Sequence, residues 1–190
     1  MRLSYLVTAL ITISSAHVYG APLPDVTISA QPVADGFSIS GGFVVPLNLC
    51  QAYNYLTDYE IEREMPGVIS VSHVRLSARR VQLHRELQER VLFLPIQIQS
   101  VVEITEQPQR GMDFVQISGS ARSYKGQWRL ESVAEGTRFI YRAQTDPGTI
   151  FPDSMAKQVI EDSLRRNFDA MVVLAQRRQG LLQSKCVSST

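Results

Sequence analysis

The side chains best suited to chemistry in this sequence are tyrosines and one histidine, not a recognisable catalytic set. The sequence has no Gly-x-Ser-x-Gly elbow, no His-Glu-x-x-His and no phosphate-binding glycine loop. Tyr59, His73 and Tyr141 could donate protons to a substrate held in a dry pocket. For His73, a structural role with its hydrogen bonds satisfied is the commoner outcome. We therefore predict no catalytic residue, no metal site and no cofactor, and we leave enzymatic activity open.

Two cysteines, Cys50 and Cys186, are the other reactive groups. In an exported protein, a pair of cysteines indicates a disulfide. The alternative is two free thiols, one buried and one on a mobile tail. Their spacing alone does not decide between these interpretations.

The first twenty residues have the pattern of a secretory signal peptide. Arg2 gives a positive start, residues 6–13 are mostly apolar, and small residues follow. Cleavage is expected after Gly20, with Ala16 as a second site. The apolar run is shorter than the roughly 20 residues that a membrane-spanning helix needs. We therefore predict an exported, periplasmic protein whose mature chain of about 170 residues forms one domain.

The charge balance excludes some partners. Without Arg2, 18 basic residues balance 18 acidic residues. Nucleic-acid binding is not expected, because phosphate contacts supply most of that affinity and need a basic surface.

Alternating apolar residues and turn signals predict a series of strands. Two N-terminal strands, over 26–33 and 37–45, meet at the Asp35-Gly36 turn. Two short helices follow, the first with Asn48 as its N-cap. Six further strands are expected over residues 68–75, 80–87, 95–105, 112–118, 126–133 and 138–145.

The C-terminal segment changes to a helical period. Apolar residues recur about every 3.6 positions from Met155 to Ala175, which predicts one amphipathic helix. Gly180 is expected to end it and to leave an irregular tail from Leu181. Because consecutive hairpins build a meander, the apolar stripe must cover one face of that sheet. The predicted fold class is therefore α+β, with about seven curved antiparallel strands wrapped around a long C-terminal helix.

Several short motifs match one family in their order and spacing. They are Leu56-Thr57-Asp58-Tyr59, Met65-Pro66-Gly67-Val68, Phe93-Leu94-Pro95, Gly119, Gly126-Gln127-Trp128-Arg129-Leu130, and Gly136-Thr137 with Tyr141. Over about residues 37–178 the chain resembles the START-like or SRPBCC helix-grip superfamily, and within it the coenzyme-Q-binding and polyketide-cyclase-like branch. The export signal, an extra N-terminal strand and the Cys186 tail depart from that pattern.

The resemblance implies a cavity between sheet and helix for lipid-like or aromatic ligands. Family members carry ligands, cyclise polyketides or chaperone lipid quinones, so the fold alone does not select a function. The expected organisation is a signal peptide over 1–20, a ligand-binding domain over 21–180 and a tail over 181–190.

The meander also predicts where a mouth and a disulfide would lie. Alternating strand directions place the loops near 92–95, 122–125 and 146–152 at one end of the sheet. These loops are apolar and aromatic, so we predict the cavity mouth there, although the same side chains could plug the core. The long helix ends at the opposite end. Cys50 also lies there if the strand before the first helix pairs with the last strand, which favours a Cys50–Cys186 disulfide.

The expected ligand-binding residues come from the sheet, the mouth loops and the helices. They are Leu56, Tyr59, Met65, Val71, His73, Phe93, Leu94, Phe114, Tyr124, Trp128, Phe139, Tyr141, Phe151, Met155, Val159 and Phe168. Trp128 packs in a core more often than it contacts a ligand. Its neighbour Gly126 leaves room for a ligand or eases a sheet bend. Arg142 is a candidate anchor for a polar head group, although a surface arginine is commoner.

Three functions remain open on the sequence. The first is an exported carrier for a hydrophobic small molecule, such as a quinone, a fatty acid or another lipid, with transient membrane contact at the mouth. The second is an enzyme of the cyclase or hydratase type that uses the same cavity. The third is an interaction module whose mouth loops dock on a membrane or a protein. The sequence specifies neither the ligand nor the oligomeric state.

Overall fold

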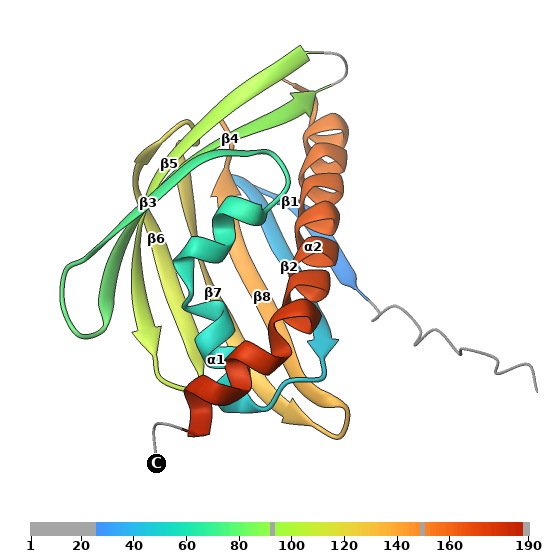
Figure 1. The fold of residues 1–190 in the computed structure, drawn as a ribbon. Helices are drawn as coiled ribbons and strands as arrows, with labels where there is room; N and C mark the ends of the chain where they lie inside the picture. Colours follow the sequence, from blue (N-terminus) through green and yellow to red (C-terminus); the bar gives the residue numbers. More distant parts are fainter. Residues whose placement is uncertain (1–25, 92–93, 149–150, 188–190) are drawn as a thin grey trace, which may run out of the picture.

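One antiparallel sheet and one long helix dominate the fold (Figure 1), which confirms the predicted α+β helix-grip class. The computed structural model describes residues 26–91, 94–148 and 151–187. In chain order its elements are β1 (Thr27–Val33), β2 (Gly36–Val45), α1 (Leu49–Leu56), the 3-10 helix η1 (Tyr59–Glu64), β3 (Val68–Arg75), β4 (Arg80–Val91), β5 (Leu94–Gln107), β6 (Gly111–Gly119), β7 (Ser123–Val133), β8 (Gly136–Asp146) and α2 (Asp153–Val187).

The sheet has eight strands in the order β1-β2-β8-β7-β6-β5-β4-β3. The strand expected over 26–33, which departs from the family pattern, forms as β1 and accounts for the difference from the predicted count of about seven. It turns into β2 at Gly36, whose φ of +109° lies in the region that favours glycine. β2 then pairs with β8, so the N-terminal hairpin adds to the far side of the C-terminal strand. This pairing is the condition under which Cys50 was expected to approach the end of α2.

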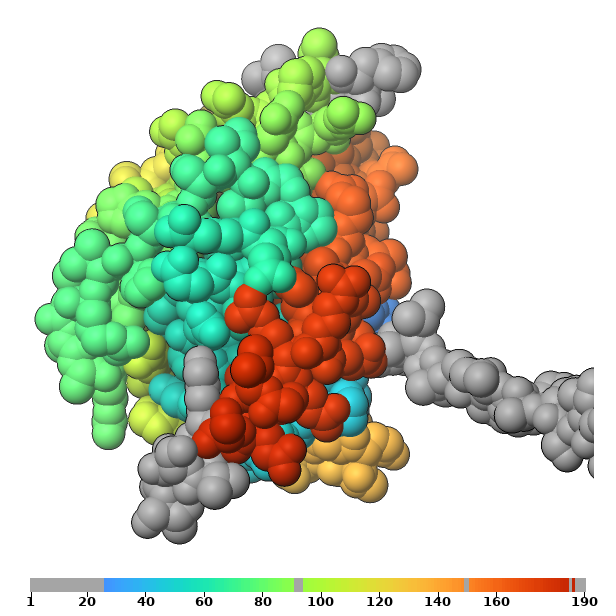
Figure 2. All heavy atoms as spheres, viewed as in Figure 1, coloured from blue at the N-terminus to red at the C-terminus, as the bar shows by residue number. Residues whose placement is uncertain are grey.

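The two short helices form where local signals place them. Asn48 caps α1 because its side chain accepts a hydrogen bond from the backbone N–H of Gln51. In return, the side-chain oxygen of Gln51 accepts a hydrogen bond from the backbone N–H of Asn48. Pro66 and Gly67 follow η1 and turn the chain into β3. Figure 2 shows the short helices lying against α2 on one face of the molecule.

The prediction that the long helix ends at Gly180 is wrong, because α2 continues to Val187. A glycine ends a helix when the residues after it are more stable outside the helix than within it. Here Leu182 is buried, and Cys186 is bonded to Cys50 of α1. Tertiary packing therefore holds the last turns in place, and residues 181–187 are not irregular.

An aromatic cluster joins α2 to the sheet. Phe168 of α2 meets Phe43 and Trp128 with ring centroids 5.4 and 5.3 Å apart, and Phe43 stacks on Phe139 at 5.0 Å. Gly41 makes this approach possible, since a Cβ there would lie 2.9 Å from the Phe168 ring. The cluster fixes the height of α2 above the concave face of the sheet.

Gly126 makes room for a side chain of the protein itself. A Cβ at this position would lie 2.6 Å from the Phe114 ring and 2.4 Å from the carbonyl oxygen of Arg142. The space left by its missing side chain is therefore occupied by Phe114, so it provides no direct room for a ligand.

Candidate functional site

A cavity of about 170 Å³ lies between the inner face of the sheet, the short helices and α2. β4 to β8 supply its floor, α1 and η1 one side, and α2 the cover. Its wall is formed by Tyr55, Leu56, Asp58, Tyr59, Ile61, Glu62, Met65, Val68, Leu83, Arg85, Leu87, Val102, Ile104, Met112, Phe114, Tyr124, Trp128, Tyr141, Leu164, Asn167, Phe168 and Met171. Apolar and aromatic groups predominate in this wall, with a few polar groups among them.

Two tyrosine hydroxyls meet in the floor of the cavity. The hydroxyl oxygens of Tyr124 and Tyr141 lie 2.8 Å apart, from adjacent strands β7 and β8. Burial, followed by the neighbouring Tyr124, raises the pKa of Tyr141 well above its ordinary value. Tyr141 therefore stays neutral near neutral pH and acts there as a hydrogen-bond donor or acceptor.

Arg85 of β4 brings a positive charge into the wall. Its Nη1 donates to Oε2 of Glu62 on η1 at 3.2 Å. Its Nε is buried and has no hydrogen-bond partner among the residues that the structure describes. Burial alone would lower the pKa of Arg85, but the Glu62 carboxylate together with Tyr124 and Tyr141 outweighs burial and raises the pKa. The guanidinium is thus permanently charged and has unused hydrogen-bonding capacity.

Asn167 of α2 faces the cavity from the other side. Within the described ranges, its side-chain amide makes no hydrogen bond to another residue. Together with Arg85 and the tyrosine pair, it gives the cavity a small set of polar groups within an otherwise apolar wall. An arrangement of this kind is typical of small-molecule sites, in which a few polar groups orient the ligand.

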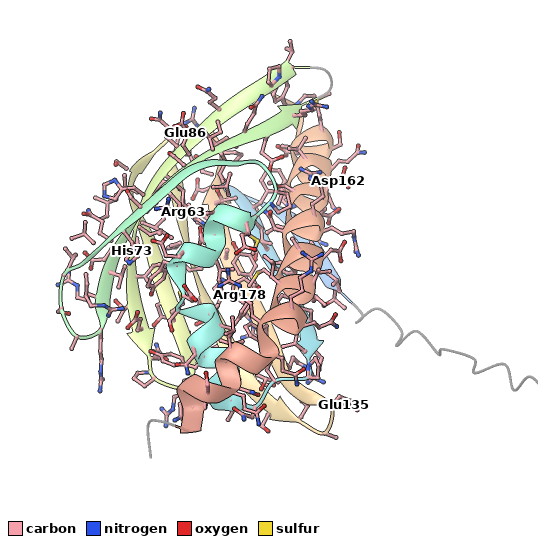
Figure 3. All side chains as sticks on the ribbon, in the orientation of Figure 1. Arg63, His73, Glu86, Glu135, Asp162 and Arg178 are labelled. Atoms are coloured by element: carbon pink, nitrogen blue, oxygen red, sulfur yellow. A yellow bond between two sulfur atoms is a disulfide. The ribbon has the colours of Figure 1, made fainter. Side chains whose placement is uncertain are left out.

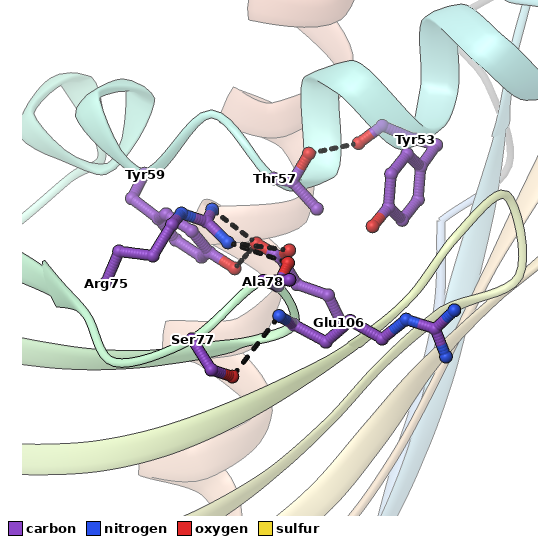
Figure 4. A network of polar contacts seen from close by, with 8 residues as sticks. Tyr53, Thr57, Tyr59, Arg75, Ser77, Ala78 and Glu106 are labelled. Carbon is purple, nitrogen blue, oxygen red and sulfur yellow. Dashed lines mark hydrogen bonds and ion pairs between the residues drawn. The ribbon is translucent and has the colours of Figure 1, made fainter.

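A second polar network lies behind Tyr59 (Figure 4). The Tyr59 ring lines the cavity, and its hydroxyl donates to Oε1 of Glu106 at 2.8 Å. Arg75 donates to both carboxylate oxygens of Glu106, at 2.9 and 3.1 Å. Because these residues come from η1, β5 and β3, the network fastens the short helix over the cavity to the sheet.

This network predicts a pH-dependent contribution to stability. Burial alone would raise the pKa of Glu106, but hydrogen bonds from Arg75 and Tyr59 outweigh it and lower the pKa. The ionised form therefore stabilises the fold above the unfolded-state pKa, about 4.3, and this stabilisation is lost as pH falls through the lower folded-state value. We expect Glu106→Gln to lower the free energy of unfolding by about 1–3 kcal/mol near neutral pH. The effect is not larger because Arg75 is half exposed and solvent screens its charge.

Urea denaturation of both proteins from about pH 7 to about pH 3 would measure this loss. The difference in free energy of unfolding between the wild type and Glu106→Gln should shrink as the pH falls toward about 3. Glu103→Gln is the matched control. Glu103 lies on β5 like Glu106, but it faces solvent and pairs there with Arg80 of β4. Its replacement should lower the free energy of unfolding by less than about 1 kcal/mol. If the wild type stayed more stable than Glu106→Gln by the same amount down to about pH 3, ionised Glu106 would not be the source of the stabilisation.

Half of the predicted ligand-binding residues meet around the cavity. They are Leu56, Tyr59, Met65, Phe114, Tyr124, Trp128, Tyr141 and Phe168. Their binding role stays a prediction, but the structure brings them together from α1, η1, β6, β7, β8 and α2.

The other predicted residues lie elsewhere. Val71 is buried outside the cavity wall, and Phe139 is fully buried under Phe43. Met155 and Val159 lie on the first turns of α2, before the part that covers the cavity. His73 lies on β3 (Figure 3), with Nδ1 3.5 Å from Oε1 of Glu60, and it does not line the cavity.

The predicted mouth loops contribute little to the cavity. Of their residues within the described ranges, Tyr124 lines the wall, Leu94 is 65% exposed and Phe151 is half-buried outside it. Phe93 lies outside the residues that the structure describes. Arg142, the proposed anchor, is exposed on the outer face of the sheet.

Sequence reasoning missed Arg85, Glu62 and Asn167. A signal for Arg85 was present, since strand alternation places it on the same face as Leu83 and Leu87. Nothing comparable marks Asn167, which occupies an ordinary position in a helical pattern.

A disulfide joins Cys50 of α1 to Cys186 of α2, as the topology favoured. Arg178 reinforces this junction, with Nη1 3.5 Å from Oδ2 of Asp58 and a second ion pair to Glu64 (Figure 3). The two helical segments that enclose the cavity are thus linked at their shared end.

The fold and cavity agree with a comparison to protein families. A family model described as "Polyketide cyclase / dehydrase and lipid transport" matches residues 45–172. The chain belongs to this family. The match covers α1 through most of α2 and confirms the resemblance to the START-like superfamily. Among curated proteins, no sequence match was found.

Solved structures share the family's fold at low sequence identity. A STAR-related lipid transfer protein from Xanthomonas axonopodis is 14% identical, with a TM-score of 0.66 over 81% of this chain and 99% of that one. The Zhui aromatase/cyclase from a Streptomyces species is 14% identical, with a TM-score of 0.59 over 81% and 96%. Human StAR-related lipid transfer protein 5 is 8% identical, with a TM-score of 0.60 over 84% and 89%. These likenesses show that the chain shares one fold with lipid transfer proteins and with an aromatase/cyclase.

Proposed function

We infer that this protein binds and carries a hydrophobic small molecule in the cavity between the sheet and α2. The observation that carries this inference is the cavity itself, an apolar space with a few polar groups in a chain of the lipid-transport and polyketide-cyclase family. A fold built only for packing would fill its interior at the density of an organic crystal.

The size of the cavity limits its occupant. A volume of about 170 Å³ is close to that of an engineered cavity, about 150 Å³, that holds benzene. One ring or a short branched chain fits this space, whereas a complete lipid quinone or fatty acid does not. For such ligands, we propose that the cavity holds the ring or head group.

The polar groups select the chemistry of that ring or head group. Arg85 offers N–H groups, and the tyrosine pair and Asn167 add further donors. A buried cation with unused donors is best satisfied by an oxygen that accepts hydrogen bonds. We therefore propose a ligand with a quinone carbonyl, a phenolic oxygen or a carboxylate next to its apolar part.

An enzyme of the cyclase or hydratase type is the second candidate, favoured by the convergence of Arg85 and Tyr141 in one wall. Arg85 would stabilise an enolate oxygen, and neutral Tyr141 would donate a hydrogen bond to it. Tyr59 and His73 are weaker candidates, because the Tyr59 hydroxyl is bound to Glu106 and His73 lies outside the cavity. Product formation from a bound ligand would distinguish this candidate from a carrier.

We further propose that the protein is exported and acts in the periplasm, with a signal peptide over 1–20 and a ligand-binding domain over 21–180. The disulfide supports an oxidising compartment. Among the described residues, no helix has the length and apolar character to cross a membrane. Exposed Leu94, where β5 begins beside the start of α2, is the proposed site of transient membrane contact.

Organic extraction of protein purified from its own host, followed by mass spectrometry, tests the carrier function. We expect one hydrophobic compound with an acceptor oxygen at near-stoichiometric yield. Leu164→Trp, which fills the cavity from α2, should lose it, whereas Val173→Trp on the exposed side of α2 should retain it. A folded wild-type protein that is consistently empty would count against the proposal.

A further inference from the structure

A buried carboxylate lies just past one end of the cavity. Leu83, Arg85 and Leu87 alternate along the inner face of β4 and line the cavity. Glu89 is the next residue on that face, and only 9% of it is exposed, yet it is not part of the cavity wall. The proposed binding mechanism gives this carboxylate no role.

Glu89 binds two residues of α2. Its Oε1 accepts a hydrogen bond from Oγ of Ser163, and its Oε2 accepts one from Nη2 of Arg166 at 2.6 Å. Ser163 and Arg166 are the chain neighbours of Leu164 and Asn167, which line the cavity. This contact, here called the Glu89 latch, therefore joins β4 to α2 immediately beyond the cavity.

Apolar residues continue on the far side of the latch. In the β4–β5 register, Ile96 lies opposite Glu89 and Ile98 opposite Leu87, so both are on the inner face. On α2, Ala156 is buried and Ile160 is half-buried and packed against the core. These four residues are here called the apolar seam. They belong to the first half of β5 and the first turns of α2, and the starts of these two elements lie at the same end of the molecule (Figure 1). Packing between apolar surfaces does not require a carboxylate, and its burial carries a desolvation cost.

We propose that the Glu89 latch closes the cavity and sets the longest ligand that it accepts. This inference rests on the proposed function. A tail that grows from the cavity toward the seam must displace the Glu89 carboxylate from Ser163 and Arg166, which leaves a buried charge without its partners. With the latch removed, each added methylene enters the apolar seam and improves affinity roughly fourfold.

Binding of para-alkylphenols, from ethyl to nonyl, by isothermal titration calorimetry tests this proposal. For the wild type, affinity should rise with chain length and then stop rising or fall. For Glu89→Ala, it should continue to rise, with a gain of at least tenfold over the wild type at the nonyl chain. Glu89→Gln keeps the size and an acceptor oxygen, so its length limit should match the wild type.

The remaining outcomes separate a failure of the latch from a failure of the proposed carrier function. Identical length profiles for the wild type and Glu89→Ala, or a wild-type profile without a limit, would overturn the latch while leaving the carrier function intact. If no alkylphenol binds the wild type and extraction finds it empty, the proposed function itself fails. Should Glu89→Ala not fold, Arg166→Ala loosens the latch from a half-exposed position, and an unchanged length limit would equally refute the proposal.

Discussion

Replacing Cys50 and Cys186 together by serine should lower the free energy of unfolding by up to about 5 kcal/mol. The disulfide closes a segment whose ends are 136 residues apart, so it strongly restricts the unfolded chain. Urea denaturation of the oxidised wild type and the double variant would measure the loss. Reduction of the wild type should reproduce it, and a reductant should leave the variant unchanged.

In the folded state, the double variant should be destabilised mainly at the end of α2 and in α1. Without the disulfide, the turns of α2 after Gly180 keep the burial of Leu182 but lose their covalent link to α1. Hydrogen exchange should therefore accelerate in residues 181–187 and in α1 before it does in the sheet. Equal stability of the oxidised wild type and the double variant, or two reactive thiols in the denatured but unreduced wild type, would contradict the disulfide.

Replacing Arg85 by methionine should weaken binding of para-ethylphenol about 10-fold to 100-fold, because the variant loses a charged hydrogen-bond donor. Methionine keeps much of the apolar stem of arginine, so binding of ethylbenzene, which lacks the oxygen, should change little. Calorimetry with both compounds separates the polar contribution from the cavity itself.

Arg142→Met is the matched control, because Arg142 is exposed on the outer face and should not affect either compound. An equal loss for both compounds with Arg85→Met would show damage to the cavity and not the loss of an anchor. Unchanged affinity for para-ethylphenol would remove Arg85 from the proposed site.

Local signals predicted most of the secondary structure. The Asp35-Gly36 turn and the Asn48 cap formed as expected, because each depends on backbone conformation and hydrogen bonds within a few residues. The end of α2 was missed for the opposite reason. Gly180 is a local stop signal, but the chain beyond it is held by Leu182 packing and by a bond to Cys50, far away in sequence.

The candidate site was predictable in part. Aromatic residues on alternating strand positions, such as Trp128 and Tyr141, were expected at the sheet–helix interface and line the cavity. Leu94 and Phe151 were assigned to a mouth by loop composition, which does not reveal whether a loop folds over a cavity or away from it. Arg142 and Arg85 both lie within strands, and only the direction of the sheet's concave face decides which one is enclosed.

The amino-acid sequence by itself determined the fold class, because hydrophobic period, turn residues and caps act over short distances and agree with one another along the chain. Tertiary structure alone decided how much space remains under α2, which charges are enclosed there, and where the space ends. Those properties depend on pairs such as Arg85 with Glu62 and Glu89 with Arg166, whose members come from different elements. Burial makes such pairs strong only after the chain has brought them together.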